Sequence, residues 1–196
     1  NSIGVRGINM ADSDKVISLA ILRHVNASPA ERAAYLKQAV AERRALGATD
    51  VEEVALVGEE AVEDTELSSE RYAELKTAEQ FVLTVSEYGY GKRSSSYDFR
   101  VTNRGGKGIR ATDTSKVDEI GRMIATFPVG DADQLMLVSD GGQLIRVPVG
   151  GIRIASRATK GVTIFNTAEG EKVASVERIS EPEGDEGEEE ETPSEA

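Results

Sequence analysis

Short stretches of alternating apolar and polar residues recur through the second half of the chain and predict β-strands. Residues 135–138 are apolar, Asp140-Gly141 is typical of a hairpin turn, and residues 144–149 resume with every second side chain apolar. Residues 99–101 and 152–154 each place an arginine between two apolar residues. We expect the apolar side chains to face a core and the arginines to face solvent.

The strand pattern is part of an internal repeat. Residues 81–111 align without gaps with residues 134–164 at an offset of 53, and the start of the chain matches residues 161–175 at an offset of 157. A repeat of this size, built from short antiparallel strands, predicts an all-β fold of propeller-like blades or a solenoid. Repetition of the arginines at equivalent positions predicts a stripe or arc of positive charge. The identical pairs are Val85/Val138, Ser86/Ser139, Gly89/Gly142, Arg93/Arg146, Arg100/Arg153, Arg104/Arg157, Lys107/Lys160 and Gly108/Gly161.

An α-helical insertion interrupts the repeat. Ser28-Pro29-Ala30-Glu31 has the pattern of a capping box with proline at the first helical position, and the helix is expected to end near Gly47. Residues 49–52 and 69–75 are two further candidate helix starts. We expect most charged side chains here to form a solvated face, and a docking surface for another domain is the alternative.

These patterns together predict five segments: the end of one blade at residues 1–25, the insertion at 26–78, one blade at 79–133, the last blade at 134–180 and a tail at 181–196. The tail is expected to be disordered because it is acidic and poor in apolar residues.

The charge is distributed unevenly among these segments. The 196 residues are 39% apolar and 30% charged, which allows a packed core, but a net charge of −12 argues against nucleic acid as a partner. Residues 25–76 hold 12 acids and 6 bases, and residues 179–196 hold 9 acids and no base, whereas residues 77–178 hold 12 acids and 14 bases. The repeats are therefore mildly basic, which restores nucleic acid as a candidate partner.

The composition excludes several kinds of chemistry. With no cysteine there is no disulfide or thiol catalysis, and His24 alone rules out mechanisms that need two imidazoles. No apolar run approaches the length of a membrane span and no signal peptide is recognisable, so we expect a cytoplasmic protein without a membrane partner. Residues 88–94 lack the glycine and hydroxyl spacing of an ATP-binding loop, so we expect no ATP site in this chain. No EF-hand pattern is present, so we expect no metal site. No nucleophile–base pair is present, so we expect no catalysis.

Residues 102–108 form the densest local motif. Three glycines allow the backbone to approach a ligand closely, and Arg104 and Lys107 add charge, which is a combination suited to phosphate oxygens. The alternative is a glycine-rich turn with incidental bases.

Four motifs, at residues 4–7, 88–93, 104–108 and 135–146, resemble the blades of the DNA gyrase A C-terminal domain. The resemblance implies a β-pinwheel whose basic rim wraps double-stranded DNA. It also implies that the chain serves a bacterial, nucleoid-associated type II topoisomerase, an A2B2 assembly of gyrase A with gyrase B that uses ATP and Mg²⁺ and has its catalytic tyrosine outside this chain. The family's heptad begins with Gln, continues with Lys or Arg, and ends with Arg-Gly-Gly-Lys-Gly. Residues 102–108 match only its last five positions, because Thr102 and Asn103 differ from the first two.

The resemblance and the repeat together assign two sets of functional residues. A propeller-like protein-interaction module and the corresponding domain of topoisomerase IV remain alternatives. The acidic tail is a candidate competitor for the basic rim, or else a solubilising segment; its densest run is Glu188, Glu189, Glu190 and Glu191. The candidate DNA-binding residues are Arg6, Lys92, Arg93, Arg100, Arg104, Gly105, Gly106, Lys107, Gly108, Arg110, Arg146, Arg153, Arg157 and Lys160.

Overall fold

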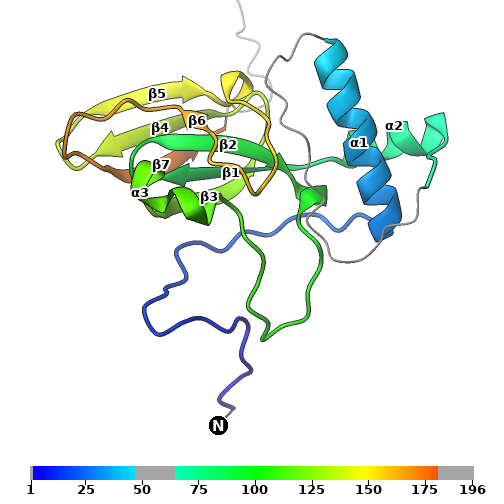
Figure 1. The fold of residues 1–196 in the computed structure, drawn as a ribbon, viewed down its shortest axis with the longest axis horizontal. Helices are drawn as coiled ribbons and strands as arrows, with labels where there is room; N and C mark the ends of the chain where they lie inside the picture. The colour runs from blue at the N-terminus through cyan, green and yellow to red at the C-terminus, as the bar shows by residue number, and fades with distance from the viewer. Residues whose placement is uncertain (1, 47–64, 181–196) are drawn as a thin grey trace, which may run out of the picture.

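Two antiparallel sheets form the body of the protein in the computed structural model, which describes residues 2–46 and 65–180 (Figure 1). The first sheet has the order β3-β1-β2-β6, and the second has the order β5-β4-β7. The strands are β1 (Phe81–Ser86), β2 (Tyr90–Ser95), β3 (Met123–Val129), β4 (Gln134–Ser139), β5 (Leu144–Pro148), β6 (Val162–Thr163) and β7 (Val173–Ile179).

The two sheets are built as copies of one unit, as the repeat predicted. Strands β1 and β4 start 53 residues apart and each forms a hairpin with the next strand. Each also pairs with a third strand through a register shift, located after Val85 in the first unit and after Val138 in the second. A 3-10 turn follows each hairpin, η1 (Ser96–Asp98) and η3 (Val149–Gly151). The sequence identities therefore mark equivalent positions in the structure.

Strand β6 connects the two units. It belongs to the second unit by sequence, yet it pairs with β2 of the first, so the first sheet is not complete within residues 79–133. The approach is close enough to require glycine: a Cβ on Gly161 would lie 2.5 Å from the carbonyl oxygen of Gly91. Gly161 also has a φ of +81°, which side chains rarely tolerate.

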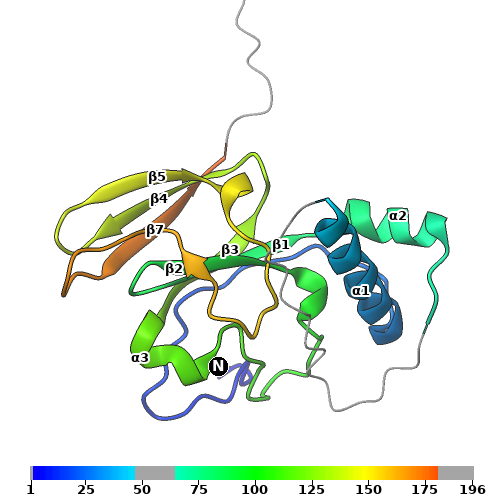
Figure 2. The same ribbon diagram turned by 45° about the horizontal axis from the view of Figure 1, so that its top comes forward.

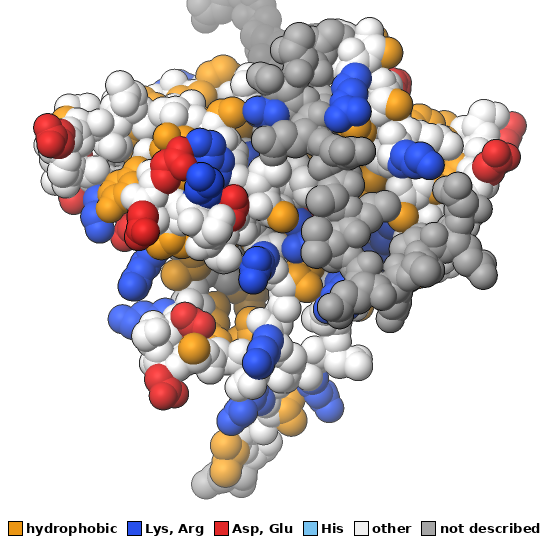
Figure 3. All heavy atoms as spheres, in the orientation of Figure 1, with side chains coloured by type: hydrophobic (Ala, Val, Ile, Leu, Met, Phe, Trp, Pro, Cys, Tyr) orange, Lys and Arg blue, Asp and Glu red, His pale blue; other side chains and the backbone are white. Residues whose placement is uncertain are grey.

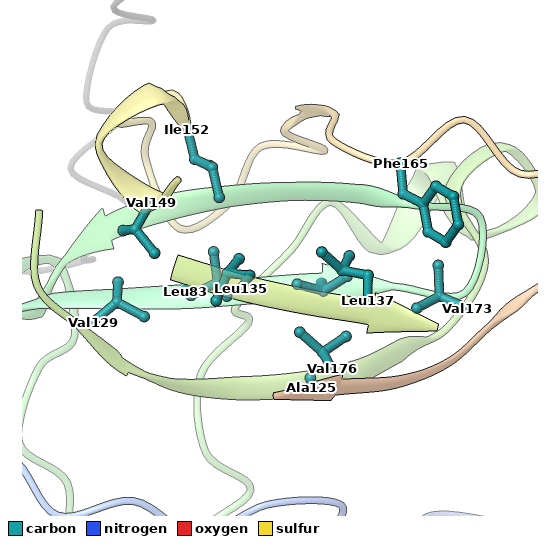
Figure 4. Packing of buried hydrophobic residues seen from close by; sticks show 11 residues of the cluster. Leu83, Ala125, Val129, Leu135, Leu137, Val149, Ile152, Phe165, Val173 and Val176 are labelled. Carbon is teal, nitrogen blue, oxygen red and sulfur yellow. The ribbon is translucent and has the colours of Figure 1, made fainter. Parts of the chain in front are cut away.

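The hydrophobic core lies between the two sheets. Leu83 from β1 packs with Leu135 and Leu137 from β4 and with Val176 from β7 (Figure 4), and Val85 belongs to the same cluster. These side chains are almost fully buried. Full burial of one such side chain contributes about 1.5–3 kcal/mol, so the contact between the units holds the body together.

The described part of the insertion forms a small helical body beside the sheets (Figure 2). Helix α1 (Pro29–Ala45) begins at the predicted capping box, and α2 (Ser69–Ala78) confirms the third predicted helix start. Their apolar faces pack around Tyr35 and Leu75, and the Tyr97 hydroxyl from η1 donates a hydrogen bond of 2.9 Å to the Leu75 carbonyl. The helices are therefore attached to the first unit.

The insertion leaves and re-enters the repeat at one place. The Gln80 side chain accepts a hydrogen bond of 2.8 Å from the Arg23 amide and donates one of 3.0 Å to the Arg23 carbonyl. The predicted helix start at residues 49–52 and the predicted tail at residues 181–196 lie outside the described residues. Among the residues that the structure does describe, every helix is too short or too polar to span a membrane.

The strand predictions for residues 99–101 and 152–154 are wrong. Residues 99–101 form no strand, and Val101, expected in the core, is 79% exposed. Residues 152–154 make a single bridge, between Ile154 and Arg93, although Ile152 is buried as expected. Short alternating runs become strands only where a neighbouring strand is available to pair. Beyond residue 112 the chain forms η2 (Thr114–Lys116) and the short helix α3 (Val117–Ile120) before β3.

Candidate nucleic-acid interface

Two loops extend together away from the sheets and helices. We call residues 2–12 the N-terminal loop and residues 99–112 the arm loop (Figures 1 and 2). The Asn9 amide donates a hydrogen bond of 2.8 Å to the Gly106 carbonyl, and the Gly105 amide donates one of 2.7 Å to the Gly7 carbonyl. Gly105 has a φ of +78°, a backbone conformation that favours glycine, so this residue allows the turn.

The two loops bring together basic side chains that are distant in sequence. We call these residues the arm cations, and all of them are exposed. In the part of the chain that the structure describes, none forms an ion pair with a carboxylate. Lys and Arg side chains accordingly cluster on this protrusion in Figure 3. The arm cations are Arg6, Arg100, Arg104, Lys107 and Arg110.

Clustered exposed cations create a positive potential that attracts anions, and exposed glycine-loop amides beside them are suited to phosphate oxygens. Gly106 and Gly108 are both exposed in this loop. The arm therefore has the chemistry of a surface for a polyanion.

The expectation that the candidate cations lie on an exposed basic rim is wrong for three of them. Lys92, Arg93 and Arg157 are only 1%, 5% and 9% exposed. The Lys92 ammonium donates to the carbonyls of Arg157, at 2.6 Å, and Thr159. A buried charge is costly unless its donors are satisfied, and carbonyl oxygens provide that here.

Arg93 connects the two units in the same way. Its guanidinium donates to the carbonyls of Ile152, at 2.8 Å, and Gly150, at 3.1 Å, and pairs with the Asp131 carboxylate. These contacts explain the burial: β2 is covered by the second unit, so its side chains meet backbone there instead of water.

The last three candidate cations lie apart from the arm. Lys160 is exposed but forms an ion pair with Glu119, and it holds the pKa of that carboxyl below its usual range chiefly by a hydrogen bond. Arg153 is partly buried, and its Nε has no hydrogen-bond partner among the described residues. Arg146 is exposed on the edge strand β5.

Equivalent cations of the two units consequently have different environments. Arg104 is exposed and its counterpart Arg157 is buried, whereas Arg93 is buried and its counterpart Arg146 is exposed. The predicted arc of equivalent, outward-facing charges is therefore wrong for these pairs. The cause is that neighbouring units cover one side of each unit only.

One important residue had no signal in the sequence. Asp98, directly before the arm loop, accepts hydrogen bonds from the Arg157 amide at 2.6 Å and from the Ser156 hydroxyl at 3.1 Å. Its equivalent in the second unit is Gly151, so the repeat did not distinguish it.

Known proteins resemble this chain in sequence and in fold. The family model described as "DNA gyrase C-terminal domain, beta-propeller" matches residues 1–23, 80–126 and 133–180. The DNA gyrase A protein of Granulibacter bethesdensis is 50% identical over 188 residues, which cover 93% of this chain and 20% of that protein. The DNA gyrase A protein of Rickettsia bellii is 39% identical over 184 residues, covering 94% and 19%.

The chain thus spans about one fifth of the length of these relatives. A solved structure titled "Structure of DNA gyrase A C-terminal domain" has a TM-score of 0.48 and 24% identity, covering 50% of this chain and 33% of that one. Because the family model matches more than half of its residues, the chain belongs to the DNA gyrase C-terminal domain, β-propeller family.

Proposed function

We propose that this chain binds duplex DNA through phosphate contacts of the arm cations. The observation that carries the proposal is their gathering on one protruding surface, without an ion pair to a carboxylate among the described residues. Membership of the gyrase C-terminal family supports DNA as the polyanion. Within a full-length gyrase A protein, the chain would help to wrap DNA for negative supercoiling.

The wider assembly is part of the same proposal. The chain would work in an A2B2 complex of gyrase A with gyrase B, in the bacterial cytoplasm and on the nucleoid, with ATP and Mg²⁺ used by other parts of the complex. The similarity to gyrase A proteins about five times its length supports this assignment. The chain's own contribution is charge on a defined surface.

Phosphate contacts determine how such binding behaves. Each contact releases condensed counterions, so affinity falls steeply with salt. The arm cations lie on irregular loops and not on a helix or strand that could enter the major groove. We therefore expect little sequence preference. Bending the duplex costs on the order of 1–6 kcal/mol, which several distributed contacts offset.

The test is a double substitution, Arg104→Ala with Lys107→Ala, in the full 196-residue chain. Binding to a duplex of mixed sequence is titrated at several salt concentrations. The slope of log affinity against log salt should fall by about two, because two phosphate contacts are lost. An unchanged slope would place the DNA elsewhere.

A control with the same change in net charge is Lys76→Ala with Lys172→Ala. Both lysines are about half exposed, lie outside the arm and pair with carboxylates, Glu42 and Glu87. Their removal should leave the slope as it is in the unmodified chain. A loss equal to that of the arm variant would mean that net charge, and not the arm, determines binding.

A second candidate function is docking of another protein or domain on the arm. It is favoured by the repeat, because Arg157 and Lys160, the counterparts of Arg104 and Lys107, bind carbonyl and carboxylate groups of protein. Duplex binding with no salt dependence, or none at all, would favour this candidate. The helical insertion is an alternative docking face.

We also propose that the acidic tail regulates DNA binding by the arm cations. Nine carboxylates without a base follow residue 180, and on a tether they would compete with DNA for the arm cations. The run at residues 188–191 has the highest density of charge. The alternative is a tail that only increases solubility.

A further inference from the structure

We propose that Arg157 is a positioning residue that clamps the base of the arm loop and so fixes the direction of the arm cations. Together with Lys92 and Asp98 it forms what we call the loop clamp. The consequence for DNA binding rests on the function proposed above. The clamp itself is a property of the chain and is testable without DNA.

Arg157 bridges both ends of the arm loop. Its Nε donates a hydrogen bond of 3.0 Å to the carbonyl of Asp98, immediately before the loop, and a terminal nitrogen donates one of 2.8 Å to the carbonyl of Arg110, near its end. A guanidinium presents several donors in one rigid plane, so a single side chain joins two backbone segments. The loop between them is closed at its base.

The rest of the clamp holds Arg157 in place. The Asp98 carboxylate accepts from the Arg157 amide, and the side chains of these two residues are only 7% and 11% exposed. Lys92 donates to the carbonyls of Arg157 and Thr159. The Thr159 carbonyl also accepts from the Asp113 amide at 3.3 Å, which secures the chain directly after the loop.

The clamp explains why a basic residue of the repeat is buried beside the candidate interface. Arg157 donates to protein at both ends of the loop and is almost inaccessible, so it is not a phosphate contact. Closing the base removes conformational freedom that the arm would otherwise lose on binding. Arg157 would therefore strengthen binding without touching DNA.

The first test follows the arm loop directly. Amide hydrogen exchange of residues 99–112 is compared between the unmodified chain and Arg157→Met, which keeps the length and loses the donors. We expect exchange about tenfold faster or more in this loop, because its closed state loses charge-assisted hydrogen bonds. Unchanged exchange in a folded Arg157→Met chain would overturn the clamp.

The matched control is Arg43→Met. Arg43 is also a partly buried arginine with a carboxylate partner, Glu79, but it lies in α1 and makes no contact with the clamp. It should leave exchange in residues 99–112 unchanged. Equal acceleration in both variants would mean that any loss of stability opens the loop, which would also overturn the proposal.

The second test separates positioning from direct contact with DNA. In salt titrations with duplex, Arg157→Met should weaken binding about three- to tenfold at every salt concentration and leave the salt slope unchanged, since no phosphate contact is lost. A slope reduced by about one would make Arg157 a phosphate contact and refute the clamp. If Arg104→Ala with Lys107→Ala has no effect on binding, the proposed function fails, and the exchange experiment still decides the clamp.

Arg157→Lys is the second variant, used if Arg157→Met does not fold. Absence of a cooperative thermal transition in Arg157→Met would show that failure. An ammonium keeps the charge but not the planar set of donors that serves both carbonyls. We expect amide exchange in the arm loop of Arg157→Lys to be about threefold faster or more than in the unmodified chain, but slower than in an unclamped loop. Exchange equal to that of the unmodified chain would refute a role for the guanidinium.

Discussion

Burial of cations among carbonyl oxygens is the main residue-scale feature of this protein. Lys92, Arg93 and Arg157 each donate to two backbone carbonyls, so a charge that would be unfavourable in an apolar core is compensated where the units meet. Arg93 and Arg157 were visible in the sequence as identities of the repeat, but the burial of the three cations was not. Exposure depends on which neighbour covers a side chain, and that is a property of tertiary packing.

Glu31 provides a residue-scale prediction about pH. A hydrogen bond from Arg71, followed by one from the Ser28 backbone, lowers the pKa of this carboxyl from 4.5 to about 2. A group whose pKa is lower in the folded state stabilises it above the unfolded pKa and loses that effect as pH falls. The contact between α1 and α2 should therefore weaken between about pH 4.5 and 2.

Titration of the Glu31 carboxyl by NMR tests this, with Arg71→Ala as the comparison. Removal of the guanidinium should raise the pKa of Glu31 towards 4.5, because its largest stabilising contact is lost. Glu31 titrating near 4.5 in the unmodified chain would contradict the ion pair of 2.8 Å between the two residues.

At the scale of elements, local signals predicted α1 well. Ser28 accepts from the Glu31 amide and Glu31 accepts from the Ser28 amide, which is the predicted capping box. The hairpins were predictable for the same reason: their turns and alternation are local. Strand β6 was not, because it exists only through its pairing with β2 of the other unit. The arm loop was not either, because residues 99–101 alternate like a strand but have no neighbouring strand with which to pair.

The cap gives an element-scale prediction. Ser28→Ala should lower the free energy of unfolding by about 1 kcal/mol, because an orphan amide at the start of α1 loses its acceptor. Urea denaturation followed by circular dichroism measures the loss. Gln38→Ala, at an exposed position of the same helix, should change stability by no more than about 0.5 kcal/mol. Equal effects of the two substitutions would argue against the cap.

Two glycines test the strand that joins the units. Gly161 and Gly142 both have positive φ, +81° and +87°, so alanine is strained at either position. A Cβ at Gly142 meets nothing within 4 Å, whereas a Cβ at Gly161 would collide with the backbone of Gly91. Gly142→Ala should cost about 1 kcal/mol and Gly161→Ala clearly more, because β6 must move away from β2. Equal losses in urea denaturation would show that the contact between β6 and β2 is not required.

At the scale of the whole molecule, net charge is a poor guide to partners. The total of −12 combines acidic segments with two loops, residues 2–12 and 99–112, that together hold five bases and one acid, Asp12. What could be predicted was the division of charge along the chain. The gathering of Arg6 with Arg104 and Lys107 could not, because it depends on hydrogen bonds between two loops that are far apart in the sequence.

The tail provides the whole-molecule prediction. Deleting residues 181–196 should tighten duplex binding at low salt, and the difference should fade as salt screens the tail. A tail of the same length with its acids replaced by glutamine should behave like the deletion, because only charge is lost. Equal affinity with and without the native tail, measured at low salt, would refute competition by the tail.

The Arg23–Gln80 contact has a consequence for how such a protein acquires new parts. The insertion departs and returns at one spot, just before β1 and outside the ladders of both sheets. A compact body whose own ends are adjacent is accommodated there without disturbing either sheet. At this junction a foreign module can be inserted, by evolution or by a protein engineer, while the arm loop keeps its geometry.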